Sequence, residues 1–165
     1  MKVKEVMMCT PYTCHRETNL GEATELMWKA NCGFLPMTEV DGMVCGVLTD
    51  RDICIALGTR NRVAGELTVG EVMGAKLYAC SPEEEIHVAL LAMRSGHVRR
   101  LPVLDSVGKA VGVLSMDDVL LRAEPAGSGK VVELSTDEVV RSFKAINQHE
   151  LLQVAKKQTA AAYIG

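Results

Sequence analysis

The sequence predicts an α+β fold in which two similar repeats pack face to face and a helical tail follows. The chain aligns with itself at a shift of 66 residues, without a gap from residue 3 to residue 52. Residues 46–49, Gly-Val-Leu-Thr, fall on residues 112–115, Gly-Val-Leu-Ser. Two copies are too few for a solenoid, so each copy is expected to cover the apolar side of the other. Each copy is expected to contain elements in the order β-α-β-β-α.

Each repeat begins with a short extended piece and a helix. Apolar residues at three- and four-residue spacing, such as Leu20, Ala23 and Met27, predict the first helix. Asn31 and Gly96 are the expected ends of the two helices, because both residue types tolerate a left-handed backbone. The predicted ranges are 11–14 and 77–80 for the extended pieces, and 19–31 and 85–96 for the helices.

A hairpin and a second helix complete each repeat. The strands at 34–38 and 100–104 each contain a Leu-Pro pair, and in the first copy an Asp-Gly turn follows. Thr49 and Ser115 are residue types that begin helices. The remaining predicted ranges are 43–48 and 109–114 for the partner strands, and 50–57 and 116–123 for the helices.

The chain therefore divides into a first repeat at 1–64, a second repeat at 65–123, and an unrepeated tail at 124–165. Residues 124–130, rich in Gly and Pro, indicate a flexible break. Ser135 to Glu138 resembles a capping box, and a helix face of Val139, Val140, Phe143 and Ile146 is expected to follow, with a second amphipathic piece at 151–155. The helix docks either on its own domain or on a partner.

Composition excludes several functions. The net charge is −3 and only 4% of residues are aromatic, which disfavours general binding to nucleic acids. No apolar run reaches the roughly 18 residues that span a bilayer, so a cytoplasmic protein without membrane contact is expected. Six cysteines without a C-x-x-C pair suit reduced thiols and no metal site. Motifs of catalytic nucleophiles and phosphate loops are missing, so no catalytic residue is assigned and we expect no enzyme.

The most informative motif is a hydroxyl residue followed three positions later by Asp, at Thr49–Asp52 and again at Ser115–Asp118. One interpretation is structural, since such a pair caps a helix. The functional interpretation is that the hydroxyl and the helix N-terminus face a phosphate, while the carboxylate accepts hydrogen bonds from a ribose. Gly46 and Gly112 would allow another chain segment or a ligand to approach closely.

The second copy carries Arg99 and Arg100 where the first has Gly33 and Phe34. Guanidinium groups suit phosphate oxygens, and strand alternation suggests that only one of the two arginines binds directly. The alternative is a solvated edge or an ion pair with Asp117. Gly33 and Phe34 favour an apolar slot for a base.

Together these motifs resemble the cystathionine-β-synthase (CBS) domain, and two copies resemble the tandem pair called a Bateman module. The resemblance rests on Val6-Met7 and Val72-Met73, on Glu22-Ala23, and on residues 46–52 and 99–103. It implies pseudo-twofold packing and two clefts for an adenosine-containing ligand such as AMP, ADP, ATP, NAD or S-adenosylmethionine. It also implies a homodimer, a disc of four repeats, that regulates an unknown protein.

The resemblance assigns roles to particular residues. Asp52 and Asp118 would hold ribose hydroxyls. Thr49 and Ser115 would contact phosphate or ribose. The second site, with its arginines, is the preferred phosphate site.

Other residues would line the adenine in the two sites. The strand entries would lie along the edge of the base, and the extended pieces would flank its ring. In the first copy these residues are Thr10, Pro11, Thr13, Gly33, Phe34 and Pro36; in the second they are Lys76, Leu77, Tyr78, Val98, Arg99, Arg100 and Pro102.

Two alternatives remain open. In one, both hydroxyl–Asp pairs are only caps, and the protein is an interaction or dimerisation module with degenerate ligand sites and a tail that binds a partner. In the other, the six cysteines make the protein a thiol redox sensor.

Overall fold

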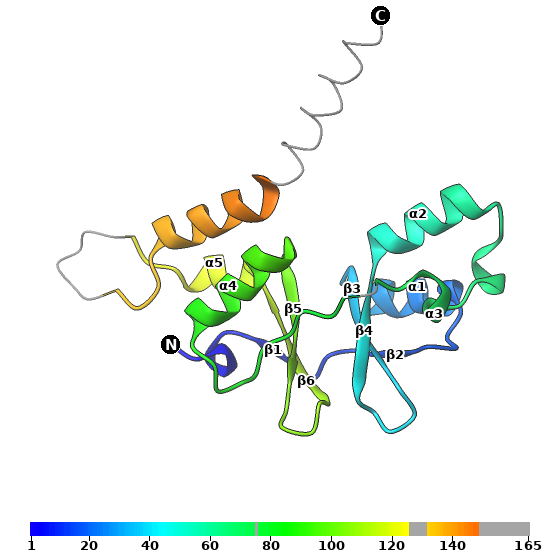
Figure 1. Ribbon diagram of the computed structural model, residues 1–165, viewed down its shortest axis with the longest axis horizontal. Helices are drawn as coiled ribbons and strands as arrows, with labels where there is room; N and C mark the ends of the chain where they lie inside the picture. The colour runs from blue at the N-terminus through cyan, green and yellow to red at the C-terminus, as the bar shows by residue number, and fades with distance from the viewer. Residues whose placement is uncertain (75, 126–131, 149–165) are drawn as a thin grey trace, which may run out of the picture.

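The computed structural model describes residues 1–74, 76–125 and 132–148. The protein has an α+β fold in which two sheets lie side by side, each with helices packed near it (Figure 1). One sheet has the strand order β2-β3-β4 and the other β1-β6-β5. The prediction of an α+β pair of repeats is confirmed.

The first repeat forms a hairpin with two helices. β3 (Phe34–Thr38) pairs antiparallel with β4 (Val44–Thr49) and parallel with β2 (Cys14–His15). α1 (Leu20–Lys29) and α2 (Asp50–Arg60) flank the hairpin in the chain. Every residue of β3 is buried, which explains its continuous apolar sequence.

The second repeat has the same design. β5 (Arg100–Leu104) pairs antiparallel with β6 (Ala110–Ser115), between α4 (Ile86–Gly96) and α5 (Met116–Arg122). Cys80 bridges to Val103 in parallel, at the place that corresponds to β2. Both first strands of the hairpins have the predicted bounds, and the helices differ from the predictions by three residues or fewer at each end.

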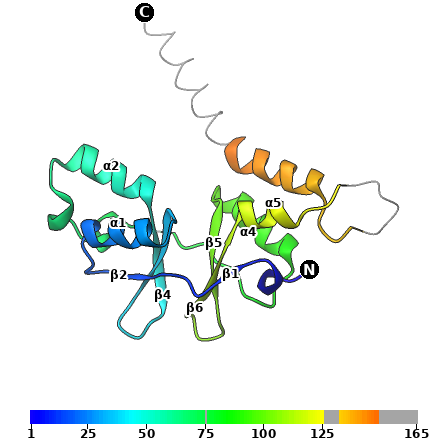
Figure 2. The same cartoon turned by 180° about the vertical axis from the view of Figure 1, so that it is seen from behind.

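The segments that precede the two repeats are exchanged between them. η1 (Val3–Glu5) and β1 (Met8–Cys9) join the second sheet, whereas η2 (Ala64–Glu66) and α3 (Val69–Val72) join the first body (Figure 2). The Val3 amide donates to the Glu84 carbonyl at 2.9 Å, and the Val69 amide donates to the Thr18 carbonyl at the same distance. The sequence repeat revealed that these segments are similar, but it did not reveal that each packs on the other repeat. The division at residue 64 separates the two copies in the sequence and stays a prediction.

These equivalent contacts give the pair pseudo-twofold symmetry. The two hairpin ends meet where Met43 bridges to Lys109, its counterpart in the second repeat. The Val44 amide donates to the Gly108 carbonyl at 2.9 Å. Gly42 and Gly108 have φ angles of 83° and 84°, which favour glycine, so the hairpin turns depend on these residues.

The second long helix ends at Gly96 as predicted, but the left-handed backbone lies one residue later. Asn31 adopts the left-handed backbone as expected, with a φ of 48°. In the second repeat, however, Gly96 is the last helical residue and His97 has the positive φ, 51°. Gly96 is needed for a different reason, because an added Cβ would lie 2.8 Å from the ring of Tyr78.

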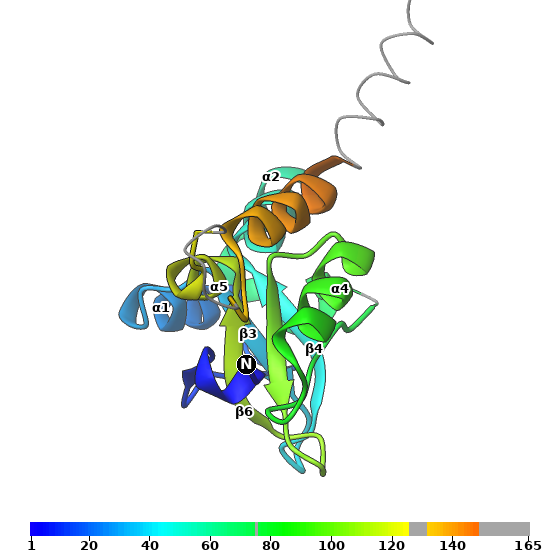
Figure 3. The ribbon, with the colours of Figure 1, turned by 90° about the vertical axis from the view of Figure 1, so that its left-hand side faces the viewer.

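The tail packs on the second repeat (Figure 3). Residues 136–148 are helical, and Leu134, Val139 and Ile146 join the core of that repeat. The predicted helix face is only partly right, because Val140 and Phe143 are 42% and 43% exposed whereas Ser142 is buried. Positions 139, 142 and 146 follow helical spacing, so they form the buried stripe. Most of the predicted break at 124–130, and the whole piece at 151–155, lie outside the described residues.

No helix in residues 1–74, 76–125 or 132–148 combines the length and the apolar character that crossing a membrane requires.

Candidate ligand-binding clefts

A cleft of about 430 Å³ lies between the two repeats, and seven of the predicted site residues line it. It combines the start of α2, an extended segment and the α4–β5 connection of the second repeat, and the tail helix. Its lining residues are Phe34, Val47, Thr49, Asp50 and Arg51 from the first repeat, Lys76, Tyr78, His97, Val98, Arg99 and Arg100 from the second, and Ile146 and Asn147 from the tail.

At the cleft, Thr49 and Asp52 form a complete capping box. The Thr49 hydroxyl donates to Asp52 Oδ2 at 2.6 Å, and the Thr49 amide donates to the same oxygen at 3.0 Å. The Asp52 amide donates back to the Thr49 hydroxyl at 3.2 Å. The capping interpretation is therefore confirmed as a structural role, but these bonds use only Oδ2 of the carboxylate.

Ser115 and Asp118 form the same box at α5. The Ser115 hydroxyl donates to Asp118 Oδ2 at 2.6 Å, and the Ser115 amide donates to it at 3.0 Å. These residues do not line the 430 Å³ cleft. The two boxes are thus locally equivalent, while their surroundings differ.

Positive charge dominates the cleft. Arg51, Lys76, Arg99 and Arg100 line it, against the single carboxylate of Asp50. In the part of the chain that the structure describes, neither Arg99 nor Arg100 has an ion-pair partner, so no pair with Asp117 is present. Because opposing walls of the cleft carry like charges, an anion is the ligand that the site would attract.

Both arginines reach this cleft, although strand alternation suggested that only one would do so. β5 begins at Arg100, so Arg99 lies in the preceding connection and is free of the strand's alternation. Arg100 pairs across the hairpin with Ser115, yet it lines the cleft that contains Thr49. The structure thus combines the arginines of the second copy with the hydroxyl of the first.

An aromatic and apolar wall accompanies the charges. The Tyr78 ring packs against Gly96, and the Lys76 Nζ lies 4.6 Å from the centre of that ring. Phe34 is buried, and Val47 and Val98 also line the cleft. The apolar slot expected at Phe34 and the arginines expected in another site therefore share one cleft.

Two smaller clefts receive few of the predicted residues. One of about 370 Å³ beside α1 and α2 contains Gly33 and Arg100, and one of about 300 Å³ beside β2 contains Thr13. The other predicted site residues line none of these three clefts: Thr10, Pro11, Pro36, Asp52, Leu77, Pro102, Ser115 and Asp118.

Sequence reasoning missed several lining residues of the main cleft. Asp50 and Arg51 lie inside the Thr49–Asp52 motif, and their position in the first turn of a helix could have revealed them. Ile146 and Asn147 carry no such signal, because the tail has no repeated counterpart.

The buried thiols are poor nucleophiles. Burial, with a smaller contribution from Cys45, raises the pKa of Cys14 to about 11, and burial with the Glu84 charge raises that of Cys80 to about 12. Cys9 and Cys54 are exposed. Among the described residues, no three His, Cys, Asp or Glu side chains gather closely enough to hold a metal ion.

Comparison with known proteins agrees with this architecture. A family model for the CBS domain matches residues 3–59 and 69–124. The CBS domain-containing protein YhcV of Bacillus subtilis is 33% identical over 129 residues, which cover 76% of this chain and 90% of that protein. The L-aspartate semialdehyde sulfurtransferase of Methanocaldococcus jannaschii is 25% identical over 117 residues, 71% of this chain but only 22% of that longer enzyme.

A solved structure shows the same arrangement. The CBS domain pair of protein MJ0100, in complex with 5′-methylthioadenosine and S-adenosyl-L-methionine, superposes with a TM-score of 0.66 at 25% identity. The match covers 72% of this chain and 96% of that one.

Proposed function

Because the chain belongs to the CBS domain family, as a tandem pair of repeats, we propose that it is a regulatory module that binds an adenine nucleotide between its repeats and modulates a partner protein. The single observation that carries the proposal is the cleft that joins Thr49 to Arg99 and Arg100. The adenosine ligands in the structure of the MJ0100 pair support the ligand class.

The charge of the cleft narrows the choice of ligand. Its cationic side chains, Arg51, Lys76, Arg99 and Arg100, favour the phosphates of AMP, ADP or ATP. S-adenosylmethionine carries a sulfonium cation, which the same side chains would repel. We therefore place adenine nucleotides ahead of S-adenosylmethionine for this chain.

Each group then has a role in binding. Arg99 and Arg100 bind phosphate oxygens, whereas the first-turn amides of α2 already donate within the protein, as the Arg51 amide does to Asp50 Oδ1 at 2.8 Å. Asp52 does not line the cleft but is bonded to Thr49, which does, and we assign its remaining oxygen, Oδ1, to accept from a ribose hydroxyl. Tyr78 and Phe34 contact the base. Ser115 and Asp118, which share the capping geometry without the cationic cleft, are assigned to a weaker second site.

The module acts by association and not by catalysis. Exposed apolar side chains on three helices, Ile55 on α2, Leu91 on α4 and Leu121 on α5, support a homodimer or a partner interface. A partner-binding tail is less well supported, because the described part of the tail packs on its own second repeat. Cys14 and Cys80 are disfavoured as sensing thiols, because burial raises their pKa, whereas Cys9 and Cys54 are exposed.

Thermal melting with AMP, ADP, ATP, NADH, GTP and S-adenosylmethionine tests the proposal. A ligand at about 100 times its Kd stabilises the fold by about 2.7 kcal/mol, which raises Tm by about 5–10 °C for this length. We expect the largest shift with an adenine nucleotide, and its loss in Arg100→Gln. The matched control is Arg94→Gln, which removes an exposed cation of α4 outside the cleft. Unchanged melting with every compound, on protein freed of bound nucleotide, would reject the proposal.

A further inference from the structure

The tail helix forms a third wall of the nucleotide cleft, from outside the two repeats. Ile146 and Asn147 line the cleft together with Thr49 and Tyr78. The tail has no repeated counterpart, so the pseudo-twofold symmetry supplies no equivalent wall on the opposite side. This wall therefore distinguishes one cleft of the pair from the other.

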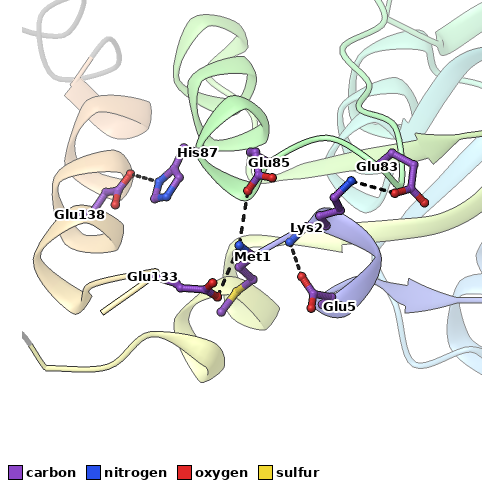
Figure 4. A network of polar contacts seen from close by, with 8 residues as sticks. All are labelled: Met1, Lys2, Glu5, Glu83, Glu85, His87, Glu133 and Glu138. Atoms are coloured by element: carbon purple, nitrogen blue, oxygen red, sulfur yellow. Dashed lines mark hydrogen bonds and ion pairs between the residues drawn. The ribbon is translucent and has the colours of Figure 1, made fainter. Parts of the chain in front are cut away.

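Buried contacts and surface contacts both hold the tail in this position. Leu134, Val139 and Ile146 are 1%, 2% and 4% exposed within the core of the second repeat. At the far end of the helix from the cleft, His87 Nδ1 lies 2.7 Å from Glu138 Oε1 (Figure 4). The amino group of Met1 lies 3.4 Å from a carboxylate oxygen of Glu133, just before the helix begins (Figure 4).

At the cleft, a hydrogen bond of His97 joins the tail to the phosphate-binding segment. His97 Nδ1 lies 3.0 Å from the Ile146 carbonyl oxygen, which can only accept, so Nδ1 donates. His97 immediately precedes Val98, Arg99 and Arg100 in the chain. Movement of the tail and movement of the arginine segment are therefore linked through this hydrogen bond.

The first repeat has a different residue at the position that corresponds to His97. Asn31 occupies the position that corresponds to His97 and has nearly the same φ, 48° against 51°. Asparagine accepts the left-handed backbone well but has a shorter side chain than histidine. The second repeat has histidine at this position, and its ring contacts the tail.

We propose that Asn147 is a ligand-binding residue and that His97 couples occupancy of the cleft to docking of the tail helix. The inference rests on the proposed function. The Asn147 Nδ2 donates one N–H to the Phe143 carbonyl oxygen at 2.8 Å, which leaves its second N–H for a phosphate or ribose oxygen and its Oδ1 to accept from an adenine amino group. If a nucleotide contacts the docked tail, it favours the docked state, and by linkage docking of the tail raises the affinity for the nucleotide by the same factor. The tail thereby carries the binding signal to the surface.

The experiment uses the full chain and three variants. His97→Asn places the residue of the first repeat at the same backbone conformation, so it removes the link without strain. Asn147→Ala removes the ligand contact. Lys144→Ala, an exposed tail residue outside the cleft, is the matched control. Affinity for AMP and ATP is measured by calorimetry, and hydrogen exchange reports the opening of the tail amides.

In the wild type, we expect AMP or ATP to slow exchange of the amides at 136–148. His97→Asn should speed their exchange without ligand and weaken binding about 5- to 10-fold, the loss of roughly one hydrogen bond. Asn147→Ala should weaken binding about as much, but it should change exchange in the free protein less than His97→Asn does, because the one bond that it removes from the tail, to the Phe143 carbonyl, lies within the helix. Lys144→Ala should change neither quantity.

The failures are distinguishable. If AMP and ATP bind the wild type but both variants retain its affinity, the coupling is refuted and the proposed function stands. The same conclusion follows if bound nucleotide does not change the hydrogen-exchange rate of the tail amides. If neither nucleotide binds the wild type, both proposals fall.

Discussion

Replacing Asp52 and Asp118 with alanine separates the structural role of each carboxylate from its role in binding. The two capping boxes have the same hydroxyl-to-carboxylate distance, 2.6 Å, and the same amide-to-carboxylate distance, 3.0 Å. Both aspartates are partly buried at the start of a helix. Any difference between the variants in ligand binding therefore comes from the surroundings and not from the cap.

The expected magnitudes follow from these contacts. Losing the carboxylate of either box costs about 1–2 kcal/mol of unfolding free energy, and hence roughly 2–8 °C in Tm, alike for both variants. Asp52→Ala also removes the ribose acceptor beside the cationic cleft. That loss costs about 1.5–3 kcal/mol of binding free energy, or roughly 10- to 100-fold in affinity. Asp118→Ala should leave this binding within about twofold of the wild type.

Calorimetric titration with the best nucleotide of the melting panel, at a temperature where both variants are folded, separates the two effects. Denaturant unfolding without ligand measures the cost of the cap. Equal affinity losses in the two variants would refute the assignment of the main cleft to Thr49 and Asp52. An unchanged affinity in Asp52→Ala would show that the motif is only a cap.

Three further outcomes are expected. Arg100→Gln should weaken ATP binding far more than adenosine binding. Titrations of the wild type at two ionic strengths should show that added salt reduces the affinity for ATP but not for adenosine. At neutral pH iodoacetamide should label Cys54 and leave Cys14 unlabelled, because a thiol with a pKa of about 11 stays protonated there; mass spectrometry that finds Cys14 labelled in the folded protein would contradict this. Gly112→Ala should lower the unfolding free energy by about 1–3 kcal/mol, because the new Cβ would lie 2.8 Å from the Met8 carbonyl oxygen. In the control variant Gly65→Ala the new Cβ meets open space, so its urea unfolding should match that of the wild type.

Local patterns predicted the elements of each repeat well. The strand at 34–38 is bounded by a helix end and a turn, both of which have clear residue signals, and its bounds are those predicted. The capping boxes at Thr49 and Ser115 likewise follow from residues three apart. Such features depend on neighbours in the sequence, so a single sequence is enough to find them.

Features that depend on distant neighbours were missed. The helix ends at Gly96 as expected, but the packing of the Tyr78 ring against Gly96 was not foreseen. Val140 and Phe143 were expected on the docking face of the tail helix, yet they are exposed, and Ser142 is buried instead. The composition of the main cleft, with an arginine segment from one repeat and a hydroxyl from the other, depends on how the repeats face each other. Periodicity within a repeat holds no information on that arrangement.

The exchange of segments between the repeats also sets the order in which the chain can fold as it is synthesised. The segment of Val3 is made first, but the Glu84 carbonyl that accepts its amide is made about 80 residues later. The buried core of the first body is complete once Leu67 and Val69 have emerged, whereas the core of the second also needs residues as late as Ile146. The entropic cost of closing a loop grows only slowly with its length, by about 0.6 kcal/mol for each doubling. The long separation between these partners therefore affects the folding pathway more than the final stability. A chain cut at residue 64 yields two fragments that each lack part of a core, and we expect them to fold only when mixed.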